Sequence, residues 1–312
     1  MIIPVNLKLF FKHRFLLLFF MMMPSFVFAL TYPLEKGISV IGRVQTSLVE
    51  PGDNFNIIAR RFDVGYYDLI EANPKLEPEK LPIWYPVVIP TKFIIPEGEQ
   101  KGIIVNLPEL RLYYFPQDKE EVITFPLGVG RQGTTTPVCL TKITIKTRYP
   151  TWYVPESIRM AREQEGVHLP KLVLPGPDNP LGDYSLRLEI PNGAYLMHGT
   201  NDSSGVGRRS SAGCIRMFPE DIEELFALVE VGTSVNIIDD PLKIGWDGKF
   251  LYLESHQPLD SDKQKIDFDA IVEKISKEAK KRNVKIDWEK ARKIAKDQNG
   301  IPETISVSDD AY

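Results

Sequence analysis

Two runs decide how this chain is understood: Tyr195-Leu196-Met197-His198-Gly199-Thr200 and Ser211-Ala212-Gly213-Cys214-Ile215-Arg216-Met217. The first is an apolar run that predicts a buried strand ending at His198. Gly205 and Gly207 let the connecting loop fold back, which would bring the imidazole to Cys214. A thiol attacks only as thiolate and needs a base within hydrogen-bond reach. The pattern therefore predicts a cysteine nucleophile, a histidine base and acyl transfer through a thioester.

Other residues of the same segment can complete such a site. The Gly199 carbonyl can accept the second ring proton of His198, and the Gly213 and Cys214 amides can face an oxyanion. Arg216 shares one face with Cys214 if the segment is extended, so its guanidinium could clamp a substrate carboxylate. Arg208 is a second candidate, and a structural ion pair is the alternative for both arginines. The other histidines that follow the N-terminal segment are interpreted as surface or packing residues: His168 and His256.

Composition limits the class of protein. The 312 residues suffice for more than one domain, and 26% charged residues with a net charge of −4 give no basic surface for nucleic acid. Lys8, Lys12 and Arg14 precede the apolar run 15–23, and Val27-Phe28-Ala29 fits a cleavage site. This predicts a signal peptide over 1–29 and a periplasmic protein without a stable membrane span after cleavage; an uncleaved anchor is the alternative.

Cysteine usage also follows from export. Cys139 and Cys214 are the two cysteines of the chain, and an exported protein could join them in a disulfide. The alternative is that Cys139 is a small apolar strand residue and Cys214 stays free for chemistry.

The pattern along the chain predicts an α+β protein. Residues 40–92 form a small module with a strand at 45–49, a helix capped by Asp53, a second helix near 66–72 and a strand at 87–89. Residues 98–240 form a mostly β domain with one prominent helix after Pro219. A β-rich extension follows at 241–261. Residues 262–312 are predicted to form two helices followed by a loose tail from 301. Asp267 and Asp287 would cap the helices, Ile266 would form a hydrophobic staple, and Trp288 would face inward.

Two resemblances add to this interpretation. The module is similar to a LysM module through Val49-Glu50-Pro51-Gly52-Asp53, residues 58–62, Leu69-Ile70-Glu71-Ala72-Asn73-Pro74 and Val88-Ile89-Pro90. The run from His198 to Met217, with Asp221, Gly176-Pro177-Asp178-Asn179-Pro180-Leu181-Gly182 and Leu110-Arg111-Leu112-Tyr113-Tyr114, resembles the L,D-transpeptidase (YkuD) family and its ErfK/YbiS group.

The second resemblance implies Cys214 as the acylated nucleophile, His198 as its base and Gly199 as the residue that holds the histidine. Ser211, Gly213 and Arg216 would line the site. Apart from the resemblance, Tyr195 and Arg208 are predicted as further substrate contacts. Ala212 stands where many members have histidine, which leaves loop geometry and acceptor choice open.

The implied reaction releases D-Ala from a diaminopimelate–D-Ala bond of peptidoglycan and passes the acyl group to an amine. The amine would belong to another stem peptide or to an outer-membrane lipoprotein. No metal or organic cofactor is implied. The module would contact glycan strands, and a small packing domain that has lost glycan binding is the alternative. A carboxypeptidase or other hydrolase on the same scaffold, and a catalytically silent wall-binding scaffold, are the alternatives.

Overall fold

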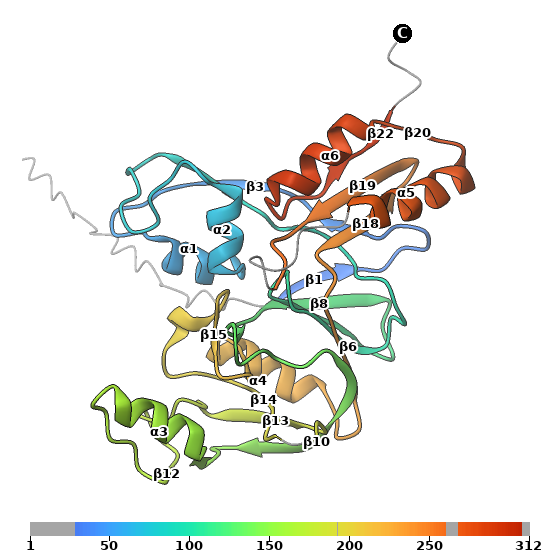
Figure 1. Ribbon diagram of the computed structural model, residues 1–312. Coiled ribbons are helices and arrows are strands. Elements are labelled where there is room, and N and C mark those ends of the chain that lie inside the picture. The colour runs from blue at the N-terminus through green and yellow to red at the C-terminus, as the bar shows by residue number, and fades with distance from the viewer. Residues whose placement is uncertain (1–28, 192, 260–267, 308–312) are drawn as a thin grey trace, which may run out of the picture.

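The computed structural model describes residues 29–191, 193–259 and 268–307 (Figure 1). The signal peptide predicted over 1–29 lies outside the described residues except for Ala29. The helix cap and staple predicted at Asp267 and Ile266 also lie outside them. Among the described helices, none is long and apolar enough to cross a bilayer.

A nine-stranded sheet forms the centre of the molecule, in the order β1-β8-β7-β6-β17-β10-β13-β14-β16. Its strands are β1 (Leu30–Pro33), β6 (Gly102–Asn106), β7 (Arg111–Phe115), β8 (Glu121–Pro126), β10 (Cys139–Arg148), β13 (Tyr184–Leu188), β14 (Leu196–His198), β16 (Ile215–Arg216) and β17 (Ser234–Ile238). Apolar runs at 103–105, 110–115, 122–125 and 235–238 supply β6, β7, β8 and β17.

Both faces of the central strands are covered. Leu112 and Tyr114 point into the main core, whereas Tyr113 and Phe115 point into a second cluster with Ile41. Alternating side chains of one strand face opposite ways, so each face needs its own partner. The main core is covered by α4 (Pro219–Leu228), through apolar residues that include Ile222, Leu225 and Val229.

The small module has the predicted order of strand, helix, helix and strand. It consists of β3 (Gln45–Leu48), α1 (Phe55–Phe62), α2 (Tyr66–Ala72) and β4 (Pro86–Ile89), and β3 pairs with β4 in antiparallel fashion. The predicted cap was wrong by one residue. Asn54 accepts from the Ile57 amide, while Asp53 pairs with Arg61 at 2.6 Å. At the two ends of the module, β2 (Val40–Gly42) pairs with β5 (Lys92–Ile94).

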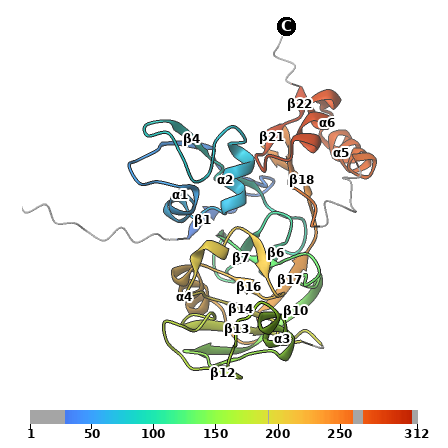
Figure 2. The same ribbon diagram turned by 60° about the vertical axis from the view of Figure 1, so that its left-hand side comes forward.

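The C-terminal extension is a sheet with two helices packed on it. Its strands are β18 (Leu242–Asp247), β19 (Phe250–Ser255) and β21 (Glu303–Thr304), and its helices are α5 (Phe268–Arg282) and α6 (Trp288–Asp297). Asp287 caps α6 as predicted, by accepting from the Lys290 amide. Figures 1 and 2 show this extension beside the module, with the β-rich domain beneath both.

Two expectations for the C-terminal region were wrong. Residues 301–307 are not a loose tail, because β21 pairs with β19 and β22 (Ser306–Val307) pairs with β20 (Lys285–Ile286) around the fully buried Ile305. Trp288 does not face inward: it is 38% exposed, because it begins α6 ahead of the first buried turn.

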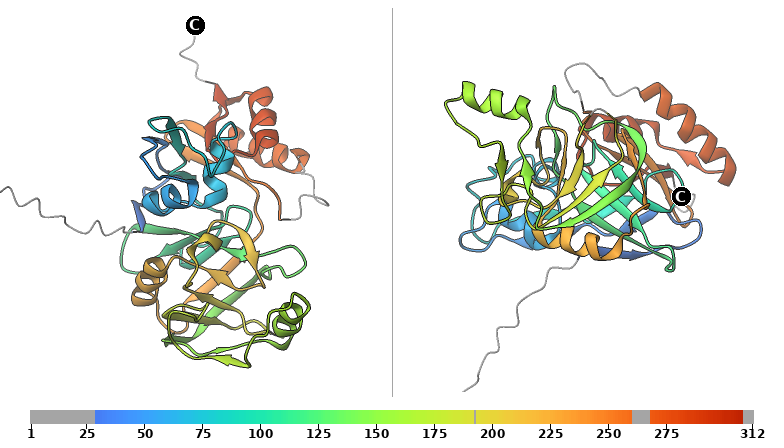
Figure 3. Two further views of the ribbon diagram at one scale, coloured as in Figure 1. Left: turned by 90° about the vertical axis from the view of Figure 1, so that its left-hand side faces the viewer. Right: turned by 90° about the horizontal axis from the view of Figure 1, so that it is seen from below.

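A second helix in the β-rich domain was missed. The segment 150–173 holds β11 (Trp152–Tyr153), α3 (Glu156–Gln164) and β12 (Leu172–Val173), and Figure 3 shows it projecting from the rest of the domain. No residue of α3 is buried, so no apolar face marked it in the sequence. The remaining short elements are β9 (Val129–Gly130), β15 (Arg209–Ser211) and a 3₁₀ turn, Ser203–Gly205.

Candidate active site

Adjacent parallel strands bring Cys214 and His198 to one face of the sheet. In the β14–β16 ladder, Met197 is opposite Ile215 and His198 is opposite Arg216. Met197 and Ile215 are fully buried in the main core. Because side chains alternate, His198 and Arg216 point the other way, as does Cys214, two residues before Arg216.

Cys214 thus lies diagonally across from His198, at a level with Leu196, whose backbone contacts the thiol. Diagonal neighbours on one face have Cβ atoms about 7 Å apart, a gap that a thiol and an imidazole can bridge. Both cysteines are free thiols, so the disulfide alternative was wrong, and Cys139 begins β10 as a half-buried strand residue.

The imidazole of His198 is fixed in one tautomer. Its Nδ1 lies 2.6 Å from the Gly199 carbonyl oxygen, the contact expected from the sequence. A carbonyl only accepts, so Nδ1 carries the proton and Nε2 has the lone pair. Burial lowers the pKa of His198 to about 4; the Gly199 bond opposes this shift and the positive charge of Arg216 adds to it.

The thiol is also shifted toward its neutral form. Burial raises the pKa of Cys214, and the Leu196 backbone and Arg216 act against that shift. Both shifts favour uncharged groups, so the pair rests as thiol and neutral imidazole. Transfer of the thiol proton to Nε2 would produce the thiolate that acyl transfer needs.

Ser211 shapes the turn that carries Cys214. Its hydroxyl donates to the Cys214 carbonyl at 2.5 Å and accepts from the Gly213 amide at 3.1 Å. The Gly213 amide, predicted to face an oxyanion, is therefore engaged inside the turn, while the role predicted for the Cys214 amide stays a prediction. Gly213 has a φ of 111°, and Thr136 donates to its carbonyl at 2.9 Å. The sequence did not indicate Thr136, because its loop lies far from the motif.

Arg216 and Tyr195 lie beside the turn that carries Cys214, and their substrate roles stay predictions. Among the described residues, Arg216 Nε is buried without a hydrogen-bond partner. Its guanidinium lies against Gly205, where an added Cβ would come within 2.9 Å of Nη1. The Tyr195 ring covers Gly213. A half-buried guanidinium with unused donor capacity beside the thiol is suited to a carboxylate.

Arg208 is placed differently from Arg216. Its guanidinium stacks on the Tyr66 ring of the module, 3.3 Å from the centroid, and donates to Asn56 Oδ1 at 3.1 Å. Next to it, the Tyr67 amide donates to the Gly207 carbonyl at 3.1 Å. Arg208 thus joins the loop between His198 and Cys214 to the module, and its substrate role stays a prediction. No pattern in the sequence indicated that this loop and the module meet.

The other histidines have the structural roles expected of them. His168 is exposed and lies 3.0 Å from Glu163. His256 is buried, with its Nε2 beside Glu254 Oε1. The Nζ of Lys243 lies 2.9 Å from the Glu254 carboxylate and 2.8 Å from the Glu109 carboxylate. Glu109, Glu254 and His256 have metal-ligating side chains, but the ammonium of Lys243 lies between the two carboxylates. This network therefore joins the C-terminal extension to β7 and its flanking turn as an ion cluster.

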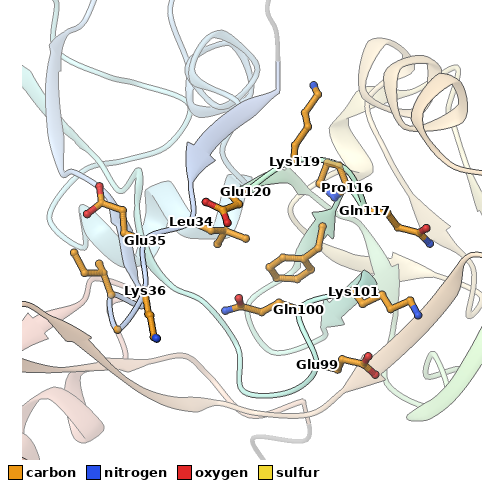
Figure 4. A pocket seen from close by; sticks show the side chains of 13 residues that line it. Leu34, Glu35, Lys36, Glu99, Gln100, Lys101, Pro116, Gln117, Lys119 and Glu120 are labelled. Atoms are coloured by element: carbon orange, nitrogen blue, oxygen red, sulfur yellow. The ribbon is translucent and has the colours of Figure 1, made fainter.

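An open hollow lies away from these residues. It measures about 830 Å³ and is bordered by polar side chains (Figure 4). Its lining residues are Leu34, Glu35, Lys36, Gly37, Ile38, Glu99, Gln100, Lys101, Phe115, Pro116, Gln117, Lys119 and Glu120. None of the site residues predicted from the sequence borders it.

Comparison with known proteins identifies the family. A model of the L,D-transpeptidase catalytic domain matches residues 100–237. The probable L,D-transpeptidase YcfS of Escherichia coli K12 is 39% identical over 244 residues, covering 77% of this chain and 75% of that protein. The chain belongs to the L,D-transpeptidase (YkuD) family. It is thus a cysteine transpeptidase of cell-wall peptidoglycan, related to the ErfK/YbiS/YcfS group.

A second relative of this L,D-transpeptidase spans nearly the full length. The probable L,D-transpeptidase ErfK/SrfK of Salmonella typhimurium is 33% identical over 301 residues, covering 93% of this chain and 95% of that one. Among solved structures, the catalytic domain of the E. faecium L,D-transpeptidase aligns with 46% of this chain and 100% of its own, at 21% identity and a TM-score of 0.34.

Proposed function

We propose that this L,D-transpeptidase works in the periplasm on peptidoglycan stem peptides, with Cys214 as nucleophile and His198 as general base. The observation that carries the proposal is their diagonal placement on one sheet face, with His198 Nδ1 anchored at 2.6 Å to Gly199 and Nε2 left as the acceptor.

In the first half-reaction, the sulfur attacks the carbonyl carbon of the diaminopimelate–D-Ala bond while Nε2 takes the thiol proton. The C–N bond breaks, the proton passes to the leaving amine, and D-Ala departs from a thioester at Cys214. In the second, an acceptor amine attacks the thioester, its proton returns through His198, and the thiol is regenerated. Arg216 would hold a substrate carboxylate during both steps.

The test is incubation with tetrapeptide muropeptides, with and without the C-terminal peptide of an outer-membrane lipoprotein. Cross-linked dimers or a peptide adduct, with release of D-Ala, are expected. Cys214→Ala should abolish both, whereas Cys139→Ala, the matched change at the other cysteine, should retain them. Trimmed monomers alone would establish the hydrolase alternative, and unchanged turnover in Cys214→Ala would overturn the assignment of the nucleophile.

Acylation can be followed separately from transfer. A carbapenem should form a covalent adduct at Cys214, seen as a mass increase of the intact protein. The adduct should be absent from Cys214→Ala and present in Cys139→Ala. A dead scaffold would show no adduct in either protein.

We also propose that the 40–92 module is a LysM module that contacts glycan strands. The turn before β4 exposes a cluster of apolar side chains, Ile83, Trp84 and Tyr85, at 54, 65 and 47%. Exposed apolar clusters mark contact surfaces, and aromatic rings can stack on sugars. Trp84→Ala should release the protein from purified peptidoglycan in a pull-down, whereas Trp288→Ala in the C-terminal extension should not. Equal retention of both variants would contradict this assignment.

A further inference from the structure

Two buried carboxyl groups meet where the module contacts the β-rich domain. Asp63 ends α1 and Asp221 lies in the first turn of α4, and each side chain is 2% exposed. Among the described residues, Asp63 Oδ1 and Asp221 Oδ2 have no hydrogen-bond partner. Burial of a carboxylate without a partner costs free energy. The pair is therefore stabilised if it holds a proton or binds a further cation.

The charged groups around the pair do not balance it. Arg60 is shared: it lies 3.4 Å from Asp221 and 3.9 Å from Asp63, and 2.9 Å from Glu220 at the surface. Arg111 donates its other bonds to Asp68 and Thr124, and reaches only the Asp63 backbone oxygen, at 3.5 Å. Acidic groups therefore outnumber the two arginines. The titratable groups that face this junction are Tyr32, Arg60, Asp63, Asp68, Arg111, Glu220, Asp221 and Glu224.

The first strand brings a backbone nitrogen to this pair. The Leu30 amide lies 3.3 Å from Asp63 Oδ2, and the Ala29 amide lies 3.3 Å from Glu224 Oε2. Leu30 is held there because β1 pairs with β8 from Leu30 onward. The cleavage signal Val27-Phe28-Ala29 predicts hydrolysis of the bond that precedes Leu30.

We propose that Asp63 and Asp221 form a binding site for the α-ammonium group of Leu30, created when the signal peptide is removed. Water hydrolyses the Ala29–Leu30 amide, the carboxylate of Ala29 leaves with the signal peptide, and the Leu30 nitrogen gains protons and a positive charge. This inference rests on the export proposed above. The new ammonium, already within hydrogen-bond distance of Asp63, supplies the missing cation.

The site would couple processing to assembly of the enzyme. Asp63 belongs to the module, Asp221 follows the β16 strand that carries the active-site segment, and Leu30 begins the edge strand of the sheet. One ammonium therefore joins three segments that are far apart in the sequence. Before cleavage, the junction has only the neutral amide of Leu30 and relies on a proton shared by the two carboxyls.

The sign of the pH effect distinguishes the two forms. In the uncleaved chain, burial raises the pKa of both Asp63 and Asp221. A raised pKa gives stability that is present at low pH and is lost as pH rises through the folded value. In the processed chain the ammonium favours the charged carboxylates, so stability should hold from pH 5 to 7.5, where the α-amine remains mostly protonated.

The experiment compares two purified forms made by cleavage of fusion proteins: one begins at Leu30, and one carries Gly-Ser ahead of Ala29. Each is melted at pH 5 and pH 7.5, with and without Asp63→Asn. At pH 7.5, Asp63→Asn should lower the Tm of the Leu30 form by about 5 °C or more. In the extended form it should be neutral or stabilising, because it removes one of two repelling carboxylates. Asp221→Asn should repeat the pattern.

In each form, the Tm of the Asp63→Asn variant is compared with the Tm of the unsubstituted protein of the same form. Both proteins of the Leu30 form lack Ala29, so the loss of Ala29 does not contribute to the Tm difference. Equal Tm shifts in the two forms would overturn the proposal, as would an exported protein whose first residue, by N-terminal sequencing, is not Leu30. Neither readout involves acyl transfer, so failure here is separable from failure of the proposed reaction.

Discussion

Replacing Ser211 with alanine should reduce activity without changing the side chain of Cys214 or of His198. The hydroxyl of Ser211 is 2% exposed and joins the Gly213 amide to the Cys214 carbonyl. Removing it leaves both backbone groups short of a partner. An unsatisfied buried group costs about 1–3 kcal/mol. Because the bond to the Cys214 carbonyl is only partly buried and loses less, Ser211→Ala should cost about 2–4 kcal/mol in total.

The same change should also slow acylation of Cys214, because the turn that positions the sulfur loses the hydrogen bonds of the Ser211 hydroxyl. Carbapenem adduct formation, followed by intact-protein mass, should fall at least about tenfold, since small displacements of a reacting group are costly. The Tm should fall by about 6–10 °C.

The neighbouring hydroxyl provides a matched control. Ser210 is exposed, and its hydroxyl lies 3.5 Å from the Gly205 carbonyl, too long for a strong bond. Ser210→Ala should change stability by less than about 0.5 kcal/mol and leave acylation unchanged. If Ser211→Ala matches Ser210→Ala in both assays, the turn does not depend on this hydroxyl and the reasoning is refuted.

Three further predictions follow from the geometry. Gly207→Ala would place a Cβ 2.0 Å from a module backbone nitrogen, so it should cost at least about 3 kcal/mol in denaturant unfolding. Gly133→Ala has a similarly positive φ but nothing within 4 Å, and should cost only about 1–2 kcal/mol; equal costs would argue against docking at Gly207. Because burial lowers the pKa of His198 to about 4, the base stays neutral as pH falls, and acylation should decline only near pH 4; a midpoint near the ordinary histidine value would contradict this. Lys243→Met should lower the free energy of unfolding, measured in urea, by about 3–5 kcal/mol, because it leaves two buried glutamates without their cation. Lys142→Met, at a surface ion pair, should lower it by about 1 kcal/mol at most. Comparable losses in the two variants would show that the buried cluster contributes little to stability.

Local patterns in the sequence were sufficient for the strands and helices whose apolar residues repeat regularly. The module's four elements and α4 were found this way, as was the strand that ends at His198. The histidine–Gly199 contact was also foreseeable, because the two residues are adjacent and a ring nitrogen needs a fixed partner. Elements with no buried face, such as α3, and short strands such as β21 gave no periodic signal.

The sequence by itself indicated the family and predicted Cys214 as nucleophile and His198 as its base, because those inferences depend on residues close together along the chain. Tertiary structure decided what those residues touch. The Gly213 amide donates to Ser211 within its own turn, and Arg208 stacks on Tyr66 of the module. Leu30, Asp63 and Asp221 come together from three distant segments. Such contacts join residues far apart in sequence, and their geometry is set by the packing of whole elements against one another, which no local pattern encodes.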